Sequence, residues 1–205
     1  MIAIIDYDAG NIKSVEKALQ FLHQESVVTR DLAVIRQASG AILPGVGAFG
    51  DAMGRLVQYG LVPVIRDFVL EQKKPFLGIC LGQQLLFEGS EESGGVEGLS
   101  LLKGHIRRIP DENGTRKVPH IGWNSLEFTK KGKLFSGIPE GSFVYFVHSF
   151  YLDGDLPCVA ARTEYGVKIG AAVEQDNLFS CQFHPEKSSD VGLRILSNFC
   201  MECKS

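Results

Sequence analysis

Two short segments carry residues whose types and spacing suit nucleophilic catalysis. The first is Gly78-Ile79-Cys80-Leu81-Gly82, which follows an apolar run beginning at Pro75 and precedes a stretch of good helix formers. This is the nucleophile-elbow pattern G-x-S-x-G with sulfur in place of oxygen. The flanking glycines leave room for a tight turn with unusual dihedrals, and the following helix N-terminus favours a thiolate. The segment therefore predicts that Cys80 is a nucleophile and not merely a buried structural cysteine.

The second segment supplies a base for this cysteine. Among the five histidines, His184 stands out because Pro185 and Glu186 follow it directly. Proline biases the preceding residue toward extended geometry, and residues two apart in an extended chain share a face. The Glu186 carboxylate is then placed to accept one imidazole N–H and leave the other ring nitrogen for the sulfur. The pattern predicts a Cys80-His184-Glu186 triad.

A glycine-rich loop completes the predicted site. Pro44-Gly45-Val46-Gly47 ends another apolar run, and glycines allow backbone N–H groups to approach a ligand closely. An oxyanion hole needs two such donors. We expect them to be the N–H groups of Val46 and of Leu81, the residue after the nucleophile.

The elements that position these segments alternate between strand and helix over residues 1–90. The expected strands are Ile2–Asp6, Val27–Thr29, Ala41–Pro44 and the run before Cys80, with helices after Asn11, which we expect to cap its helix, and over 52–58 and 61–72. This alternation favours βαβ units and a parallel sheet, whose active edge lies at the carboxyl ends of the strands. All three segments are expected to meet there.

The second half of the chain is richer in short strands. We expect a mobile, acidic surface loop over Glu88–Gly98, which we do not interpret as a metal site, and a final helix over Ser188–Cys200. The expected strands are His105–Ile109, Val118–Gly122, Phe143–Val147, Val159–Thr163, Lys168–Glu174 and Leu178–Phe183, with a hairpin turn at Asn113-Gly114.

The composition fits one well-buried core, so we expect a single domain over residues 1–205. A net charge of −3 offers no electrostatic argument for nucleic acid or an anionic membrane. No apolar run approaches bilayer length and no export signal precedes the first strand, so we expect a cytoplasmic protein with reduced cysteines. The Cys200/Cys203 pair is interpreted as incidental on a polar tail.

Together, the cysteine elbow, the PGVG loop and the His-Pro-Glu ending resemble the class I (triad) glutamine amidotransferases over nearly the whole chain. Most glutaminase domains of that family carry PGPG where this chain has PGVG. Three further segments, Asp6–Asn11 (DYDAGN), His120–Asn124 (HIGWN) and Tyr145–Phe150 (YFVHSF), resemble the branch that serves histidine biosynthesis. The resemblance implies an α/β, flavodoxin-like fold with a mostly parallel central sheet flanked by helices and an added β-rich second half.

The resemblance also implies an activity and partners. Glutamine is hydrolysed to glutamate and ammonia through a thioester, without a cofactor or metal. The ammonia passes to a (β/α)8-barrel cyclase subunit, with which the chain forms a heterodimer that makes imidazole glycerol phosphate and an aminoimidazole carboxamide ribonucleotide. The implied substrate-binding residues are Gly45, Gly47, Gln84, Tyr145, His148 and Ser149. The implied interface residues are Asn11, Trp123 and Lys187, although Trp123 is equally suited to be a core anchor.

Three other functions remain open from the sequence. The chain could be a glutaminase of another pathway, of the anthranilate or guanylate type, which PGVG and HIGWN weigh against. It could use the same triad as a cysteine peptidase or γ-glutamyl hydrolase. It could also be a non-catalytic regulatory domain on the same scaffold, although such a domain would usually have lost part of the triad.

Overall fold

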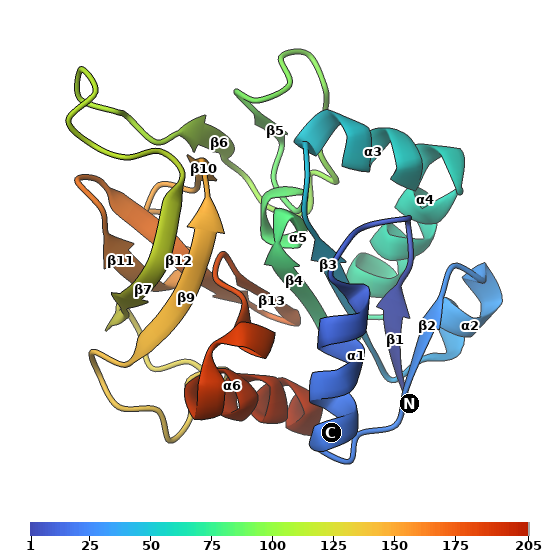
Figure 1. The fold of residues 1–205 in the computed structure, drawn as a ribbon. Coiled ribbons are helices and arrows are strands. Elements are labelled where there is room, and N and C mark those ends of the chain that lie inside the picture. The colour runs from blue at the N-terminus through green and yellow to red at the C-terminus, as the bar shows by residue number, and fades with distance from the viewer. Residues whose placement is uncertain (205) are drawn as a thin grey trace.

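A twisted sheet of eight strands runs through the centre of the molecule in the computed structural model, which describes residues 1–204 (Figure 1). The strand order is β2 (Ser26–Thr29), β1 (Ile2–Ile5), β3 (Gly40–Gly45), β4 (Phe76–Cys80), β13 (Leu178–Cys181), β12 (Lys168–Gln175), β11 (Val159–Glu164) and β8 (Glu127–Phe128). Neighbours from β2 to β13 are parallel, and the pairings from β13 to β8 are antiparallel. The predicted α/β fold with a mostly parallel sheet is confirmed.

Helices cover both faces of this sheet, because its central strands are apolar on both sides. In β1, Ile2 and Ile4 belong to the core shared with α1 (Ile12–Phe21) and α6 (Ser189–Glu202). Ala3 and Ile5 belong to the opposite core, shared with α3 (Phe49–Gln58) and α4 (Leu61–Arg66). Successive side chains of one strand point to opposite faces of the sheet and so contribute to two cores. The loops at the strand ends lie outside both cores and can carry functional residues.

Several helices differ in extent from the sequence-based expectation. A short helix, α2 (Leu32–Gln37), was not predicted, and the segment after α4 continues as a π-helical turn, η1 (Asp67–Glu71). The helix after the cysteine, α5, spans only Leu81–Gln84. The expected cap of α1 is wrong in its detail: Asn11 occupies the N-cap position with φ 73°, but its side chain makes no capping bond.

The β-rich half forms two small sheets beside the central one. Strand β7 (His120–Ser125) pairs with β9 (Phe143–His148), and β10 (Phe150–Tyr151), β6 (His105–Arg108) and β5 (Gly89–Ser90) form the other. The turn at Asn113-Gly114 is present, but the expected hairpin is not, because β6 and β7 each pair with other strands. The connection between β6 and β7 is longer than a tight hairpin loop, so the two strands are not held next to each other and each can pair with another strand.

The acidic loop over Glu88–Gly98 is anchored to the start of α3. The backbone N–H of Phe49 donates to Glu92 Oε2 at 2.8 Å, and that of Gly50 donates to Ser93 Oγ at 3.0 Å. Within residues 1–204 no group of three His, Cys, Asp or Glu side chains is arranged to hold a metal ion. No helix in the same range is long and apolar enough to cross a membrane.

The C-terminal cysteine pair lies in the core, not on a polar tail as expected from the sequence. Cys200 and Cys203 are buried against the α1/α6 face of the sheet. The helix α6 extends to Glu202, so both thiols are carried back onto the sheet by its inner face. All five cysteines are unpaired and buried.

Candidate active site

The register of the central sheet brings three predicted segments into one row. Gly45 at the end of β3 is paired with Cys80 at the end of β4. Ile79 is paired with Cys181 of β13, so Gln182 is the next residue along that strand and lies beside Cys80. Because all three strands are parallel, their carboxyl ends open on the same edge.

Cys80 sits on a strained strand-to-helix turn, as a nucleophile elbow requires. Its φ of 55° and ψ of −110° are a backbone conformation that side-chain-bearing residues rarely adopt. The strain is at the cysteine, whereas the flanking glycines serve close packing. A Cβ on Gly82 would lie 1.8 Å from the Leu43 carbonyl oxygen, and one on Gly78 would lie 2.5 Å from the Gly82 oxygen. The expectation that the glycines adopt the unusual dihedrals is therefore corrected: they let helix α5 approach the sheet.

His184 and Glu186 form a buried pair next to this turn. Nδ1 of His184 donates to Oε1 of Glu186 at 2.7 Å, and the two side chains are 1% and 0% exposed. The sequence argument explained this pair by an extended segment, but Pro185–Lys187 forms a 3-10 turn, η2. The turn folds Glu186 back onto the ring that precedes it, with the pairing that was expected.

The charges around His184 favour its imidazolium form. Burial alone would lower the pKa of His184, but the nearby Cys80 thiol and the Glu186 carboxylate raise it to about 9. The second ring nitrogen, Nε2, is buried without a hydrogen bond of standard geometry, although the ring is close enough to Cys80 for the pKa of His184 to be raised by it. An imidazolium beside a thiol is the arrangement that supports a thiolate at neutral pH.

Asn11 belongs to the same cluster. Its side-chain amide donates to Glu186 Oε1 at 2.5 Å and lies 3.3 Å from His184 Nδ1. The sequence suggested a helix cap and a partner contact for this half-buried residue. The amide is directed at the carboxylate that orients the histidine and does not cap α1, and the partner contact stays a prediction.

A cavity of about 300 Å³ opens beside the sulfur. It is lined by Val46, Gly47, Cys80, Leu81, Gln84, Glu92, Pro119, Val147, His148, Ser149 and Phe150. Both expected oxyanion donors, Val46 and Leu81, are therefore in its wall. Gly47 has φ 109°, which only glycine adopts without strain, so the loop that carries the Val46 peptide depends on this residue.

Two expected substrate residues do not line this cavity. The ring of Tyr145 packs against Trp123 at 6.1 Å between centroids, and its backbone holds the triad segment by accepting from His184 N at 2.9 Å. Gly45 lies behind the loop, where a Cβ would meet the Tyr7 hydroxyl at 2.2 Å. Tyr145 and Gly45 therefore lie outside the cavity wall, and a contact between either residue and the substrate stays a prediction.

The sequence argument missed Gln182. This fully buried side chain donates from Nε2 to Cys80 Sγ at 3.8 Å and accepts at Oε1 from Gln84 Nε2 at 3.0 Å. Its position directly after the predicted strand and two residues before His184 is the signal that could have found it. Gln182 joins the nucleophile to a residue of the substrate cavity.

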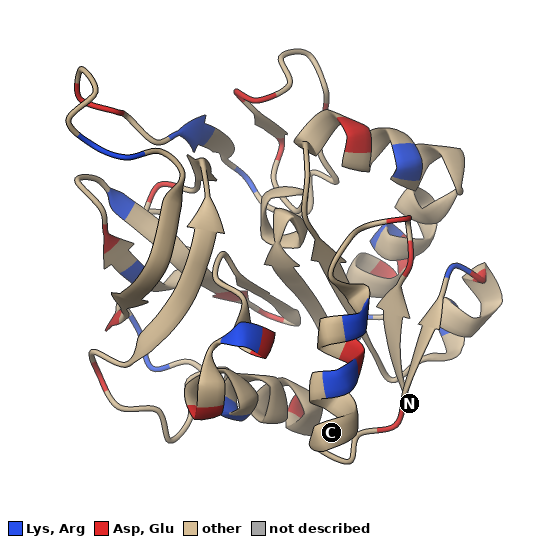
Figure 2. Ribbon diagram, in the orientation of Figure 1, with Lys and Arg blue, Asp and Glu red and all other residues tan. Residues whose placement is uncertain are grey.

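The expected interface residues surround this end of the sheet. Trp123 is 52% exposed, which excludes the core-anchor alternative, and Lys187 is exposed beside the triad on η2. Ile121 and Phe143 are also exposed, on the paired strands β7 and β9. Neither strand carries a Lys, Arg, Asp or Glu residue, so Figure 2 shows the two strands as adjacent tan arrows.

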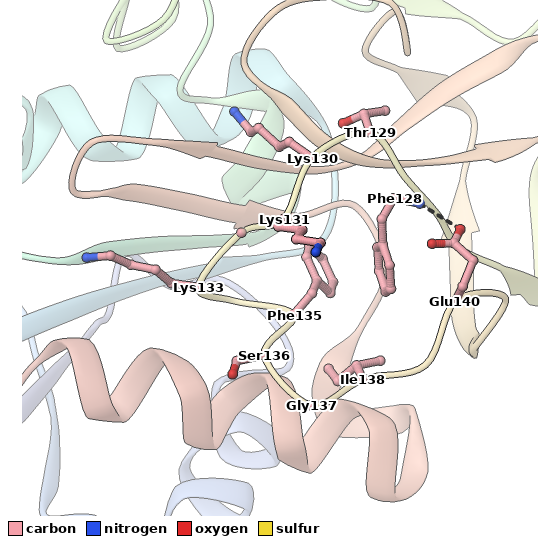
Figure 3. Close-up of a pocket in the computed structure, with 11 residues that line it drawn as sticks. Phe128, Thr129, Lys130, Lys131, Lys133, Phe135, Ser136, Gly137, Ile138 and Glu140 are labelled. Atoms are coloured by element: carbon pink, nitrogen blue, oxygen red, sulfur yellow. Dashed lines mark hydrogen bonds between the residues drawn. The ribbon is translucent and has the colours of Figure 1, made fainter.

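A larger cavity lies elsewhere and carries no comparable chemistry. It has a volume of about 800 Å³ and is formed by the loop from Phe128 to Glu140 beside α6 (Figure 3). Phe128, Phe135 and Ile138 form its apolar side, and Lys130 and Lys133 extend away from them. These two lysines already bond Glu174 O and Glu202 Oε2.

Comparison with known proteins agrees with this geometry. A family model described as glutamine amidotransferase class-I matches residues 3–203. A protein of Caldanaerobacter subterraneus subsp. tengcongensis named imidazole glycerol phosphate synthase subunit HisH is 50% identical over 97% of both chains. One of the same name from Moorella thermoacetica is 53% identical over 97% of this chain and 93% of its own.

Solved structures share the fold at low sequence identity. A crystal structure of a glutamine amidotransferase has a TM-score of 0.77 and 18% identity, with full coverage of both chains. The glutaminase domain of Trypanosoma brucei CTPS with bound acivicin has a TM-score of 0.66 and 17% identity over 98% of this chain and 93% of its own. At these identities the structures support the fold alone.

Proposed function

Since this chain belongs to the class I glutamine amidotransferase family, we propose that Cys80, His184 and Glu186 carry out its glutaminase reaction in the cavity beside the sulfur. The chain is the glutaminase subunit of histidine biosynthesis, as its relatives of about 50% identity over nearly the full chain indicate. The observation that carries the assignment of residues is the buried His184–Glu186 pair adjoining a cysteine on a strained elbow.

In the first step, the Cys80 thiolate attacks the side-chain carbonyl carbon of glutamine. The negative charge that develops on the carbonyl oxygen is stabilised by the N–H groups of Val46 and Leu81. His184, held as an imidazolium by its two neighbours, gives its proton to the amide nitrogen as the C–N bond breaks. Ammonia leaves, and the γ-glutamyl group remains on the sulfur as a thioester.

In the second step, water replaces ammonia. The now neutral His184 accepts a proton from the water as it attacks the thioester, and glutamate is released with Cys80 regenerated. Glu186 does not exchange a proton in this scheme. It keeps His184 oriented and stabilises its charged form through the 2.7 Å hydrogen bond. Gln84, Gly47, His148 and Ser149 line the cavity and are the proposed contacts for the amino-acid end of the substrate.

We further propose that the ammonia is delivered to a (β/α)8-barrel cyclase subunit that docks over the triad end of the sheet. The relatives are named as subunits of a synthase, which supports a partner subunit. The uncharged strands β7 and β9, with Ile121, Trp123 and Phe143 exposed, supply a surface of the composition found at interface cores. Lys187 and Asn11 flank it next to the triad.

The test is glutamate release by the purified chain, with and without the cyclase partner and the nucleotide ligand of that partner. We expect turnover in the loaded complex and a loss on the order of 10³-fold or more in Cys80→Ala. Mass spectrometry after treatment with a glutamine-like diazoketone should find one adduct, on Cys80. Turnover that survives in Cys80→Ala would refute the proposed chemistry, and free folate or peptide products without ammonia would favour a hydrolase of another class.

A further inference from the structure

Two buried histidines that the triad does not use lie side by side at the substrate cavity, where His148 is in the cavity wall and His120 is behind it. His120 of β7 and His148 of β9 are 3% and 6% exposed, and Nδ1 of His120 lies 3.0 Å from Nε2 of His148. The ring of His120 is stacked between Phe146 and Tyr165, with centroid distances of 4.8 and 4.1 Å. Rings held this firmly have fixed orientations, so their hydrogen bonds are directional.

The partners of the two rings determine where each proton lies. His148 Nδ1 is 2.8 Å from the Phe150 carbonyl oxygen, which only accepts, so Nδ1 carries the proton and Nε2 is the acceptor. His120 must then donate from Nδ1, which leaves its Nε2 to accept from Asn124 Nδ2 at 3.4 Å. The Asn124 amide is itself oriented, because its Oδ1 accepts the Ser125 N–H at 2.9 Å.

Both rings are neutral in this arrangement. Burial lowers the pKa of His120 to about 4 and that of His148 to about 3. Each neutral ring has one donor and one acceptor nitrogen, and each is used once. The pair is therefore a one-way chain of donors that ends on the Phe150 carbonyl.

The Phe150 carbonyl connects this chain of hydrogen bonds to the active site. The Phe150 oxygen accepts a second hydrogen bond, from Gln84 Nε2 at 3.1 Å, and Gln84 continues through Gln182 to Cys80 Sγ. The neighbouring end of β9 also contacts the sulfur directly, since the Cys80 thiol lies 3.9 Å from the Val147 carbonyl oxygen. A displacement of the Phe150 carbonyl would move both the amide of Gln84 and the wall of the cavity.

We propose that His120 is a positioning residue for the glutamine site: through His148 it fixes the Phe150 carbonyl, and thereby the Gln84 amide and the strand end that flanks Cys80. The inference rests on the proposed glutaminase function and adds to it a residue that does not touch the cavity. His120 acts by donating a hydrogen bond to His148, and the packing of its ring on Phe146 and Tyr165 is not sufficient to fix the Phe150 carbonyl.

Two substitutions separate donation from packing. His120→Phe keeps a ring between Phe146 and Tyr165 but leaves His148 Nε2 without a donor. His120→Asn loses the ring but keeps an N–H donor close to the position of Nδ1. Tyr165→Phe is the matched control, because it keeps the ring stacked on His120 and removes only the hydroxyl that bonds the Lys117 carbonyl.

The experiment compares two alkylation rates at Cys80 in the full-length chain. A glutamine-like diazoketone reports on the whole glutamine site, and iodoacetamide reports on the sulfur alone. We expect His120→Phe to react at least about tenfold more slowly with the diazoketone and within about twofold of wild type with iodoacetamide. His120→Asn should stay within about threefold of wild type with both reagents, and Tyr165→Phe should be unchanged.

If the diazoketone reacts with His120→Asn as slowly as with His120→Phe or more slowly, the inference is overturned in favour of ring packing. Equal diazoketone rates for all variants would overturn it as well, because His120 would then have no effect on the glutamine site. If His120→Phe does not fold, as judged by its thermal unfolding, His120→Ala takes its place against His120→Asn, since both lack the ring and only asparagine donates. A wild-type chain that the diazoketone fails to modify would count against the proposed glutaminase function itself. Failure of that function can therefore be distinguished from failure of the inference about His120, in which the wild type reacts and only the order of the variants differs.

Discussion

The side-chain amide of Asn11 donates, across 175 residues of sequence, to the same carboxylate oxygen of Glu186 that accepts the hydrogen bond from His184. The loop after the first strand is thereby tied to the last turn before the final helix. This neutral donor adds a second hydrogen bond to a buried carboxylate, which would be strongly disfavoured without partners. The orientation of the catalytic histidine thus depends on a residue outside the triad.

Replacing this amide by a carboxylate should impair catalysis. In Asn11→Asp two buried carboxyl groups would face each other, so one must take up a proton or move, and we expect glutamate release to fall by about 10- to 100-fold. Asn11→Gly, which keeps the left-handed backbone and removes the amide, should lose about tenfold. The matched control is Asn113→Asp, at an exposed position with φ 61°, which should retain full activity. An active Asn11→Asp enzyme would show that the contact is dispensable.

The two glycines Gly82 and Gly54 should respond oppositely to alanine. A Cβ on Gly82 would lie 1.8 Å from the Leu43 oxygen, whereas one on Gly54, within α3, has no atom within 4 Å outside its own helix. Gly82→Ala should lower the free energy of unfolding by at least about 3 kcal/mol, and Gly54→Ala should raise it by up to about 1 kcal/mol. Urea denaturation measures both. A Gly82→Ala chain of normal stability would mean that helix α5 is free to move away from β3.

The raised pKa of His184 predicts how stability changes with pH. Because the folded-state pKa of about 9 exceeds the ordinary value of 6.5, the protonated ring stabilises the folded chain fully below pH 6.5, and this contribution is lost as the pH rises to about 9. The stability difference between wild type and His184→Gln should therefore shrink by on the order of 2–3 kcal/mol between pH 6 and pH 9.5. Urea titrations at several pH values measure it.

Removing the thiol provides the check on this assignment. In Cys80→Ala only Glu186 remains to raise the pKa of His184, so the loss of stability should begin at a lower pH. A difference between wild type and His184→Gln that stays constant across this range would contradict the raised pKa.

The exposed tryptophan should matter for association and not for folding. Trp123 is 52% exposed on an uncharged strand, and Trp→Ala at the centre of an interface typically costs about 2 kcal/mol or more. We expect Trp123→Ala to weaken binding to the cyclase partner by about 30-fold, measured by calorimetry, with an unchanged melting temperature. Phe21→Ala, at a 70% exposed aromatic residue at the end of α1, is the control and should bind normally. Equal affinities for both variants would place the partner elsewhere.

The elements near the nucleophile were predictable because their causes are local. The apolar run before Cys80, the G-x-C-x-G pattern and the His184-Pro185-Glu186 sequence are each recognisable within a few residues, and the parallel sheet then follows from strands and helices alternating in sequence. What the sequence by itself determined is therefore the fold class, the elbow, and the candidate members of the triad.

Only the tertiary structure decided which distant groups support them. The amides of Asn11 and Gln182 reach Glu186 and Cys80, and the ring of Tyr145 turns away to Trp123, because strand register and helix packing brought those positions together. The pairing of His120 with His148 likewise depends on β7 and β9 lying side by side, although the Asn113-Gly114 turn favoured a hairpin between β6 and β7. Hydrogen bonds between residues far apart in sequence depend on distances that no local pattern encodes, so these supporting contacts appear only once the chain is folded.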